Sequence, residues 1–165
     1  MLDLAADAWD MRSTYRPGSV VSFQNGFHSK GYMGRGWSYP EAHGVWTEGS
    51  EAELVFRCDP KPAGSIEARF RLTPFFAKGQ SQVIAISVNG VDLCNWSFSG
   101  EEDRVASWRS FMIPSQIAGS DELRLLLQVK NPFSPKQAGF SPDPRALGVC
   151  IAEIILLPVE DEPGA

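Results

Sequence analysis

One glycine-rich stretch of the sequence gathers Trp37, Tyr39 and Trp46, with Glu41 and His43 between them. A sugar ring presents an apolar C–H face edged by hydroxyl groups. An aromatic ring can cover that face while a carboxylate or an imidazole bonds the hydroxyls, and tyrosine and tryptophan suit such half-wet positions. The stretch therefore indicates carbohydrate binding. The competing interpretation, in which the rings are buried and hold a long loop to a sheet, is favoured for Trp46 and stays open for Trp37 and Tyr39.

A second stretch, rich in proline, runs from Asn131 to Gly148 and carries Asp143 and Arg145 just before the last expected strand. Proline fixes the backbone angle φ, so a stiff loop of this kind loses less entropy when it binds a ligand. Asp143 and Arg145 would form a polar rim for a ligand, or a structural pair in which Asp143 bonds backbone amides and Arg145 meets a carboxylate. The predicted ligand-binding residues are Trp37, Tyr39, Glu41, His43, Asp143 and Arg145.

Signals for catalysis or metal binding are weak. The sequence has no G-x-S-x-G motif. A Ser-His-Asp triad is conceivable from His28 or His43 with Asp143, but the sequence alone does not place these residues together. The short ligand spacings of zinc sites are also absent. Asp59, Asn131 and Asp143 could supply oxygen ligands to a structural Ca²⁺, although no EF-hand spacing supports this. We therefore expect no catalytic residue and no cofactor, with a structural calcium ion as the open alternative.

The rest of the chain consists of short runs in which apolar and polar residues alternate. A period of two is typical of half-buried strands, and the runs predict about eight or nine of them. The clearest run spans Ser65 to Leu72 and places Glu67, Arg69 and Arg71 on a solvated face. Short strands separated by frequent turn signals predict an all-β fold, an antiparallel, jelly-roll-like β-sandwich with two long packed loops. The expected core residues are Ile66, Phe70, Leu72, Ile84, Ile86, Leu123, Leu125, Leu127, Ile154 and Leu156.

Three local patterns make sharper predictions. The pair Asn89-Gly90 accepts positive φ at both central positions of a tight turn, so it predicts a hairpin. The run from Gln82 to Val88 is nearly all apolar and predicts a central strand buried on both faces. The run from Gly148 to Leu157 has a period of two that predicts one shared face for Cys150, Ala152, Ile154 and Leu156.

Composition bounds the organisation of the chain. Its 165 residues are 43% hydrophobic and carry a net charge of -5, which suits one core and disfavours nonspecific nucleic-acid binding. We expect an N-terminal tail or short helix over residues 1–18, the sandwich over 19–159 and a flexible acidic tail over 160–165. The sequence shows no membrane span and no signal peptide. The three cysteines are widely spaced and expected to be reduced and largely buried, so we expect a cytoplasmic location.

The two stretches also carry motifs in a fixed order: Gly36-Trp37-x-x-Pro40-Glu41-x-x-Gly44-x-Trp46-Thr47-x-Gly49, then Asn131-Pro132-x-Ser134-Pro135 and Ser141-x-Asp143-x-Arg145-x-Leu147-Gly148. This pattern resembles a β-sandwich accessory module appended to bacterial phosphoglycerol transferases of the glucan-modifying type, and to some bacterial glycosyltransferases. The resemblance covers residues 36–157, most of the chain. It implies a noncatalytic, glycan-associated domain. Such modules are usually joined to a larger catalytic domain, and in this sequence we see only the module.

The first functional hypothesis is therefore a noncatalytic carbohydrate-binding or glycan-associated module of a bacterial glycan-modifying system. Its ligand would be a glycan or oligosaccharide, and a glycan-processing enzyme is a candidate partner. The alternative is a structural or protein-interaction module that positions such an enzyme without binding sugar. A small glycan esterase or lyase is a third hypothesis, which requires His28 or His43 beside a serine or a carboxylate. An exposed ring face of Trp37 or Tyr39 in a groove would favour the first hypothesis over the second.

Overall fold

The structure, a computed structural model, describes residues 14–26 and 28–160, and within them the chain forms ten β-strands. The strands are β1 (Thr14–Tyr15), β2 (Val20–Ser22), β3 (Val45–Glu48), β4 (Glu51–Cys58), β5 (Ser65–Pro74), β6 (Gln82–Val88), β7 (Val91–Phe98), β8 (Ser107–Ile113), β9 (Leu123–Val129) and β10 (Leu147–Val159). The connections contain the short helices α2 (Ser115–Ala118) and α3 (Pro135–Ala138) and the 3-10 turns Gln24–Gly26 and Glu101–Arg104. The predicted helix near the N-terminus and most of the predicted acidic tail lie outside the described residues.

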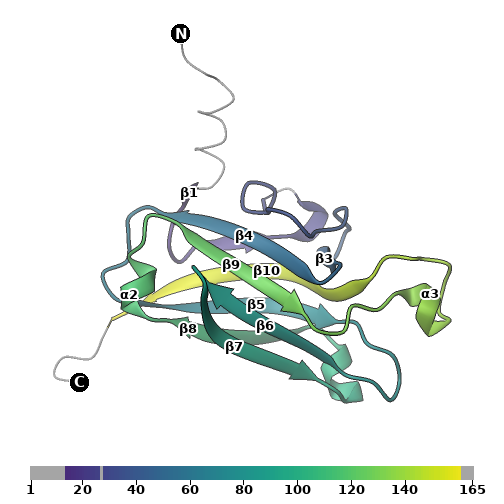
Figure 1. The fold of residues 1–165 in the computed structure, drawn as a ribbon. Helices are drawn as coiled ribbons and strands as arrows, with labels where there is room; N and C mark the ends of the chain where they lie inside the picture. Colours follow the sequence, from purple (N-terminus) through teal and green to yellow (C-terminus); the bar gives the residue numbers. More distant parts are fainter. Residues whose placement is uncertain (1–13, 27, 161–165) are drawn as a thin grey trace, which may run out of the picture.

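The strands form two sheets that pack face to face (Figure 1). One sheet has the order β1-β4-β9-β6-β7 and the other has the order β2-β10-β5-β8, with β3 also paired to β10. The pairs are antiparallel except for β1 with β4, which is parallel. The predicted all-β sandwich is confirmed, while the jelly-roll-like connectivity stays a prediction. Sequence reasoning missed β1, because Thr14 and Tyr15 lie in the segment that was expected to be a tail.

The core lies between the sheets and is formed by one face of each strand. In β4, Ala52, Leu54 and Phe56 are fully buried while their neighbours are half-exposed. Burying an apolar side chain of this size contributes roughly 1.5–3 kcal/mol, so a one-residue slip of the register would be costly. Each of the predicted core residues is buried: Ile66, Phe70, Leu72, Ile84, Ile86, Leu123, Leu125, Leu127, Ile154 and Leu156.

Strand β6 is less deeply buried than the sequence predicted. It lies inside its sheet, between β9 and β7, as expected for a central strand. Its burial alternates, however, and Val83, Ala85 and Ser87 are half-exposed. The prediction of burial on both faces was wrong because each sheet of the sandwich covers only one face of the other.

Strand β10 changes its phase at a β-bulge. Its register with β5 shifts between Ile151 and Glu153. An extra residue in one strand reverses which side chains point inward. Val149 and Ile151 therefore join the core together with Ile154, whereas Cys150 lies outside that cluster. The predicted shared face for Cys150, Ala152, Ile154 and Leu156 was wrong for its first two members.

The predicted hairpin is confirmed by the backbone of its turn. Asn89 has a φ of 50° and Gly90 a φ of 83°, and the two residues connect β6 to β7. Asparagine and glycine are the residues that adopt positive φ most readily. The tight turn sets the register of the β6–β7 pair, which holds Trp96 and Phe98 in the core.

The first long loop closes one edge of the sandwich by bridging the two sheets. In the middle of this loop, which connects β2 to β3, the Gly34 backbone N–H donates to the Glu53 carbonyl on β4 at 2.8 Å. A few residues later, the Ser38 N–H donates to the Trp46 carbonyl on β3 at 2.9 Å. Because β4 and β3 belong to different sheets, the described residues of the loop are an ordered part of the fold, as predicted. Gly36, with a φ of 90°, lies against the start of β4, where an added Cβ would overlap the Glu51 carbonyl oxygen.

Candidate functional site

The two stretches singled out in the sequence meet at the guanidinium of Arg145, whose side chain is only 13% exposed. Its Nη2 donates to Asp143 Oδ2 at 2.7 Å, and its Nη1 donates to Ser38 Oγ at 2.8 Å and to Glu41 Oε2 at 3.3 Å. Its Cζ lies 4.5 Å from the centroid of the Tyr39 ring. These five residues, here called the loop cluster, join the loop before β3 to the loop before β10. Sequence reasoning predicted four of them and missed Ser38.

The loop before β10 is held by its own hydrogen bonds. Ser134 caps α3, because its Oγ accepts from the Gln137 backbone N–H at 3.0 Å while Gln137 Oε1 accepts from the Ser134 N–H at 3.0 Å. This reciprocal arrangement is a capping box, and α3 ends at Gly139 with a φ of 77°. Asp143 Oδ1 also accepts from the Arg145 backbone N–H at 3.0 Å. These bonds therefore hold the loop that carries Asp143 and Arg145 in one conformation without a ligand.

Both carboxylates of the loop cluster, on Glu41 and Asp143, form ion pairs with Arg145. Hydrogen bonds from Arg145 lower the pKa of the Asp143 carboxyl below its usual value, and the same contacts raise the pKa of Arg145. Burial raises the pKa of the Cys150 thiol to about 12, and the nearby negative charge of Glu41 adds to this shift. At neutral pH, Asp143 is therefore ionised and Cys150 is protonated.

Trp37 lies at the closed edge of the sandwich and is half-buried against the core. Its Nε1 donates to the Glu53 backbone carbonyl at 2.9 Å, and its ring centroid is 6.0 Å from that of Phe23. Trp46 is also half-buried and meets Phe75 edge-on, with 6.2 Å between the centroids. The polar tip of Trp37 is already bonded inside the protein, so its contacts favour the structural interpretation.

The other predicted residues divide into two groups. Tyr39 is 61% exposed, although Arg145 packs over its ring. His43 is exposed in the turn that Glu41 and Gly44 close by pairing with each other. The structure thus brings Tyr39, Glu41, Asp143 and Arg145 together, and it places Trp37 and His43 outside this group. The positions of these residues do not show whether any of them contacts a ligand, so the predicted ligand-binding set stays a prediction.

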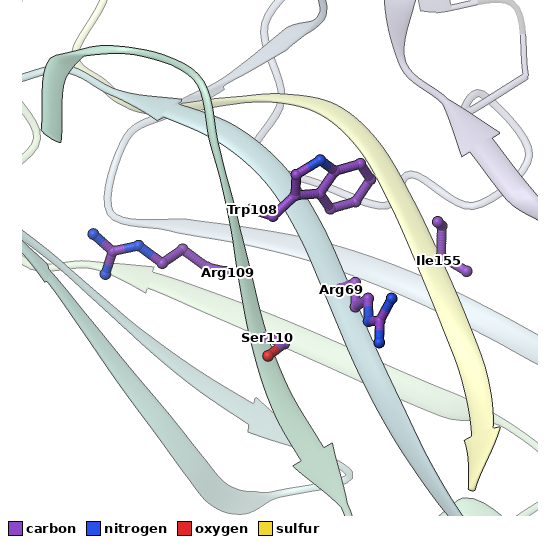
Figure 2. Close-up of a pocket in the computed structure, with 5 residues that line it drawn as sticks. All are labelled: Arg69, Trp108, Arg109, Ser110 and Ile155. Carbon is purple, nitrogen blue, oxygen red and sulfur yellow. The ribbon is translucent and has the colours of Figure 1, made fainter.

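The outer face of the sheet that contains β10, β5 and β8 carries a second candidate group that sequence reasoning missed. Trp108 on β8 lies opposite Arg71 on β5, and one step along the strands Arg69 lies between Ser110 and Ile155. In Figure 2, the Trp108 indole lies on the side of the sheet that carries Arg69 and Ile155, and Arg109 points away from them. A shallow depression of about 260 Å³ is lined here by Arg69, Trp108, Arg109, Ser110 and Ile155.

Ion pairs flank the Trp108 indole, which is 47% exposed. Arg69 Nε donates to Glu67 Oε1 at 2.8 Å, and its Nη2 lies 3.4 Å from the second carboxylate oxygen. Arg71 Nη1 donates to Glu153 Oε1 at 3.1 Å. We call this group of Trp108, Arg69, Arg71, Glu67 and Glu153 the Trp108 face. It offers one large ring and, beside it, both hydrogen-bond donors and acceptors.

A signal for the Trp108 face was present in the sequence. The run from Trp108 to Ile113 alternates, and since Phe111 and Ile113 are buried, Trp108 and Met112 must point outward. An outward tryptophan on a strand presents a large ring with a polar N–H at one end, which suits a half-wet contact surface. Sequence reasoning predicted only a solvated face for this region, because the pairing of Trp108 with Arg71 depends on the register of β5 and β8.

The positions of the histidines and of Asp143 give no support to a catalytic triad, and those of the possible ligand side chains give none to a metal centre. The Asp143 carboxylate is engaged by Arg145, and His28 lines a separate cavity with Tyr15 and Asp59. Over residues 14–26 and 28–160, no group of three or more His, Cys, Asp or Glu side chains is arranged to hold a metal ion. In the same part of the chain, no helix has the length and apolar character needed to cross a membrane.

Comparisons with known proteins support the fold. No protein-family model matches the chain, and no curated protein matches its sequence. Among solved structures, the chain is similar to the mosquito-larvicidal Cry4Aa toxin from Bacillus thuringiensis, with a TM-score of 0.51 and 13% identity over 90% of this chain and 25% of that chain. It spans a quarter or less of the length of the first structures that it matches.

Two shorter similar structures are carbohydrate-binding modules. One is CsCBM6-3 from Clostridium stercorarium in complex with cellobiose, at 10% identity and a TM-score of 0.46 over 88% of this chain and 98% of that chain. The other is CBM36 in complex with calcium and xylotriose, at 12% identity and a TM-score of 0.46 over 84% of this chain and 98% of that chain. At such identities a likeness describes the fold alone. The resemblance to modules of phosphoglycerol transferases is not seen in these comparisons and stays a prediction.

Proposed function

We propose that this chain is a noncatalytic carbohydrate-binding β-sandwich module and that the Trp108 face is its main glycan contact. The observation that carries this proposal is the half-exposed Trp108 indole, 47% accessible on the outer face of the sheet, with the Glu67–Arg69 and Arg71–Glu153 pairs beside it. A large ring left in water on a rigid strand is unfavourable for the isolated domain, and covering it with an apolar ligand face recovers that free energy.

The physical match is with a sugar ring lying flat on the indole. The C–H face of the sugar would cover the indole, and its hydroxyls would reach the guanidinium and carboxylate groups on β5 and β10. Hydrogen bonds to charged groups contribute about 1.5–3 kcal/mol each, more than those between neutral groups. Because β5 and β8 are paired along their whole contact, these side chains are held on rigid elements and little ordering is needed on binding.

The loop cluster is a second candidate contact. Its favourable feature is Tyr39, whose ring is 61% exposed beside the charged groups of Glu41, Asp143 and Arg145. Its unfavourable feature is that the Arg145 donors already bond Ser38, Glu41 and Asp143. The loop cluster therefore serves first as a clamp between two loops, with Tyr39 as the part that a glycan can reach.

The wider setting is also part of the proposal. We place the module in a bacterial glycan-modifying system, in the cytoplasm, next to a glycan-processing enzyme. The competing function is a structural or protein-interaction module, which one specific observation favours. Val20 and Met112 are exposed by 54% and 47% on the outer side of the same sheet, so an apolar protein surface could cover it.

A glycan array followed by calorimetric titration tests the proposal on single variants. Trp108→Ala should weaken binding of the best array ligand at least tenfold, whereas Trp108→Tyr should keep most of it, because a smaller ring still covers a sugar face. Tyr39→Ala reports separately on the loop cluster. A parent protein that binds no glycan on the array would contradict the proposal and favour the protein-interaction module.

A further inference from the structure

The Trp108 face has no net charge, although it is built largely from charged residues. Arg69 and Arg71 supply two positive charges and Glu67 and Glu153 supply two negative charges. From this balance we propose that the face selects uncharged glycan segments and discriminates against uronic acids, sulfated sugars and other anionic sugars. This inference rests on the proposed function and names the ligand class of the same site.

Each arginine on the face is already neutralised by its own carboxylate. Arg69 contacts both carboxylate oxygens of Glu67, at 2.8 and 3.4 Å, and Arg71 bonds Glu153 at 3.1 Å. An anionic ligand would have to displace one of these carboxylates from its arginine or approach it as a like charge. Like charges at close range disfavour binding, so the carboxylates exclude anionic ligands.

The neighbouring strands add no free positive charge to this face. Ile155, Leu157, Ser110 and Met112 occupy the outward positions beside Arg69 and Glu67. Arg109, at the start of β8, points away from the face and bonds Asp103 at 3.3 Å. At these described positions the face therefore lacks an unopposed cation, the group that forms the strongest hydrogen bonds to a carboxylate or sulfate.

Uncharged hydroxyls fit the same pairs well. A hydroxyl both donates and accepts a hydrogen bond. It can therefore accept from the guanidinium of Arg69 while it donates to the carboxylate of Glu67, without breaking the ion pair. A face that binds in this way should show little dependence on salt, since no net charge is neutralised.

The experiment compares neutral and anionic oligosaccharides of the same backbone. The probes are xylohexaose and cellohexaose, each beside a glucuronate-substituted or sulfated counterpart of equal length, and an array of other neutral and anionic glycans. The parent should bind at least one neutral glycan at least tenfold more tightly than its anionic counterpart. Because no net charge is neutralised on binding, its affinity for the neutral glycan should stay nearly constant between 50 and 500 mM salt.

Charge variants make the test specific to the face. Glu67→Gln combined with Glu153→Gln leaves Arg69 and Arg71 unopposed, and it should shift the neutral-to-anionic preference at least fivefold toward the anionic glycan. The matched control is Glu53→Gln combined with Glu122→Gln, which removes two carboxylates that pair with Arg124 on the other sheet and should leave the preference unchanged.

The outcomes separate the two claims. A parent that prefers the anionic glycan, or a face variant with the same preference as the control variant, overturns the inference and leaves carbohydrate binding standing. A parent that binds nothing on the array overturns the proposed function and the inference with it. Thermal melting of each variant checks that the fold is retained, and exposed ion pairs of this kind contribute little to folding.

Discussion

Replacement of Trp37 by alanine distinguishes a buried structural ring from a ligand platform. Truncating a fully buried tryptophan to alanine lowers the free energy of unfolding by about 3–5 kcal/mol, and for a half-buried ring we expect about 2–3 kcal/mol. The lost bond from Nε1 to the Glu53 carbonyl, 2.9 Å long, adds about 1 kcal/mol. That carbonyl also accepts from the Gly34 N–H at 2.8 Å, so it is not left without a donor. The expected total is about 3–4 kcal/mol.

Thermal unfolding measures this loss directly. In a domain of this length, 1 kcal/mol shifts Tm by about 2–4 °C, so Trp37→Ala should lower Tm by about 6–16 °C. Trp108→Ala is the matched control, because it removes the same ring from a position that is 47% exposed on the sheet face. Its cost should be within about 1 kcal/mol, as for other surface substitutions.

The two variants should also differ in ligand binding. Trp108→Ala should weaken glycan binding at least tenfold and lower Tm by no more than about 2–4 °C. Trp37→Ala should keep its affinity for glycan at temperatures where it is folded. A Trp37→Ala protein that melts together with the parent but no longer binds glycan would refute the structural interpretation of this ring.

Two further predictions concern the thiols and a glycine. Burial raises the pKa of Cys58 to about 11 and that of Cys150 to about 12, so at pH 8 a thiolate-dependent reagent should label the half-exposed Cys94 first. Mass spectrometry of the unreduced protein should find three thiols, and an intramolecular disulfide would contradict this. Gly36 and Gly49 share a φ of 90°, but only Gly36 lies against other backbone atoms. In denaturant unfolding, Gly36→Ala should therefore destabilise the fold by about 1–3 kcal/mol more than Gly49→Ala, and equal losses would show that the loop at Gly36 can move aside.

The strands were predictable because their signals are local. Alternation along the run from Ser65 to Leu72 identifies a half-buried strand, since neighbouring side chains on any strand point to opposite faces. The pair Asn89-Gly90 identifies a tight turn from the two residues that form it. The strand Thr14–Tyr15 was missed because two residues carry no period, and it exists only through its pairing with β4.

The bulge in β10 could not be read from the sequence for a related reason. The apolar residues from Val149 to Ala152 suit either phase of the strand, and the register with β5 decides which of them face the core. Tertiary pairing thus placed Val149 in the core and Cys150 beside the loop cluster.

The sequence alone determined the fold class, most of the core and the residue types that could contact a glycan. Which of these residues meet was decided by the tertiary structure. Arg145 reaches Ser38 and Glu41 across more than one hundred positions of sequence. Trp108 lies beside Arg71 because β5 and β8 pair in one register. Local patterns say which way a side chain points from its own strand, whereas its neighbours across a sheet are set by the packing of the whole chain.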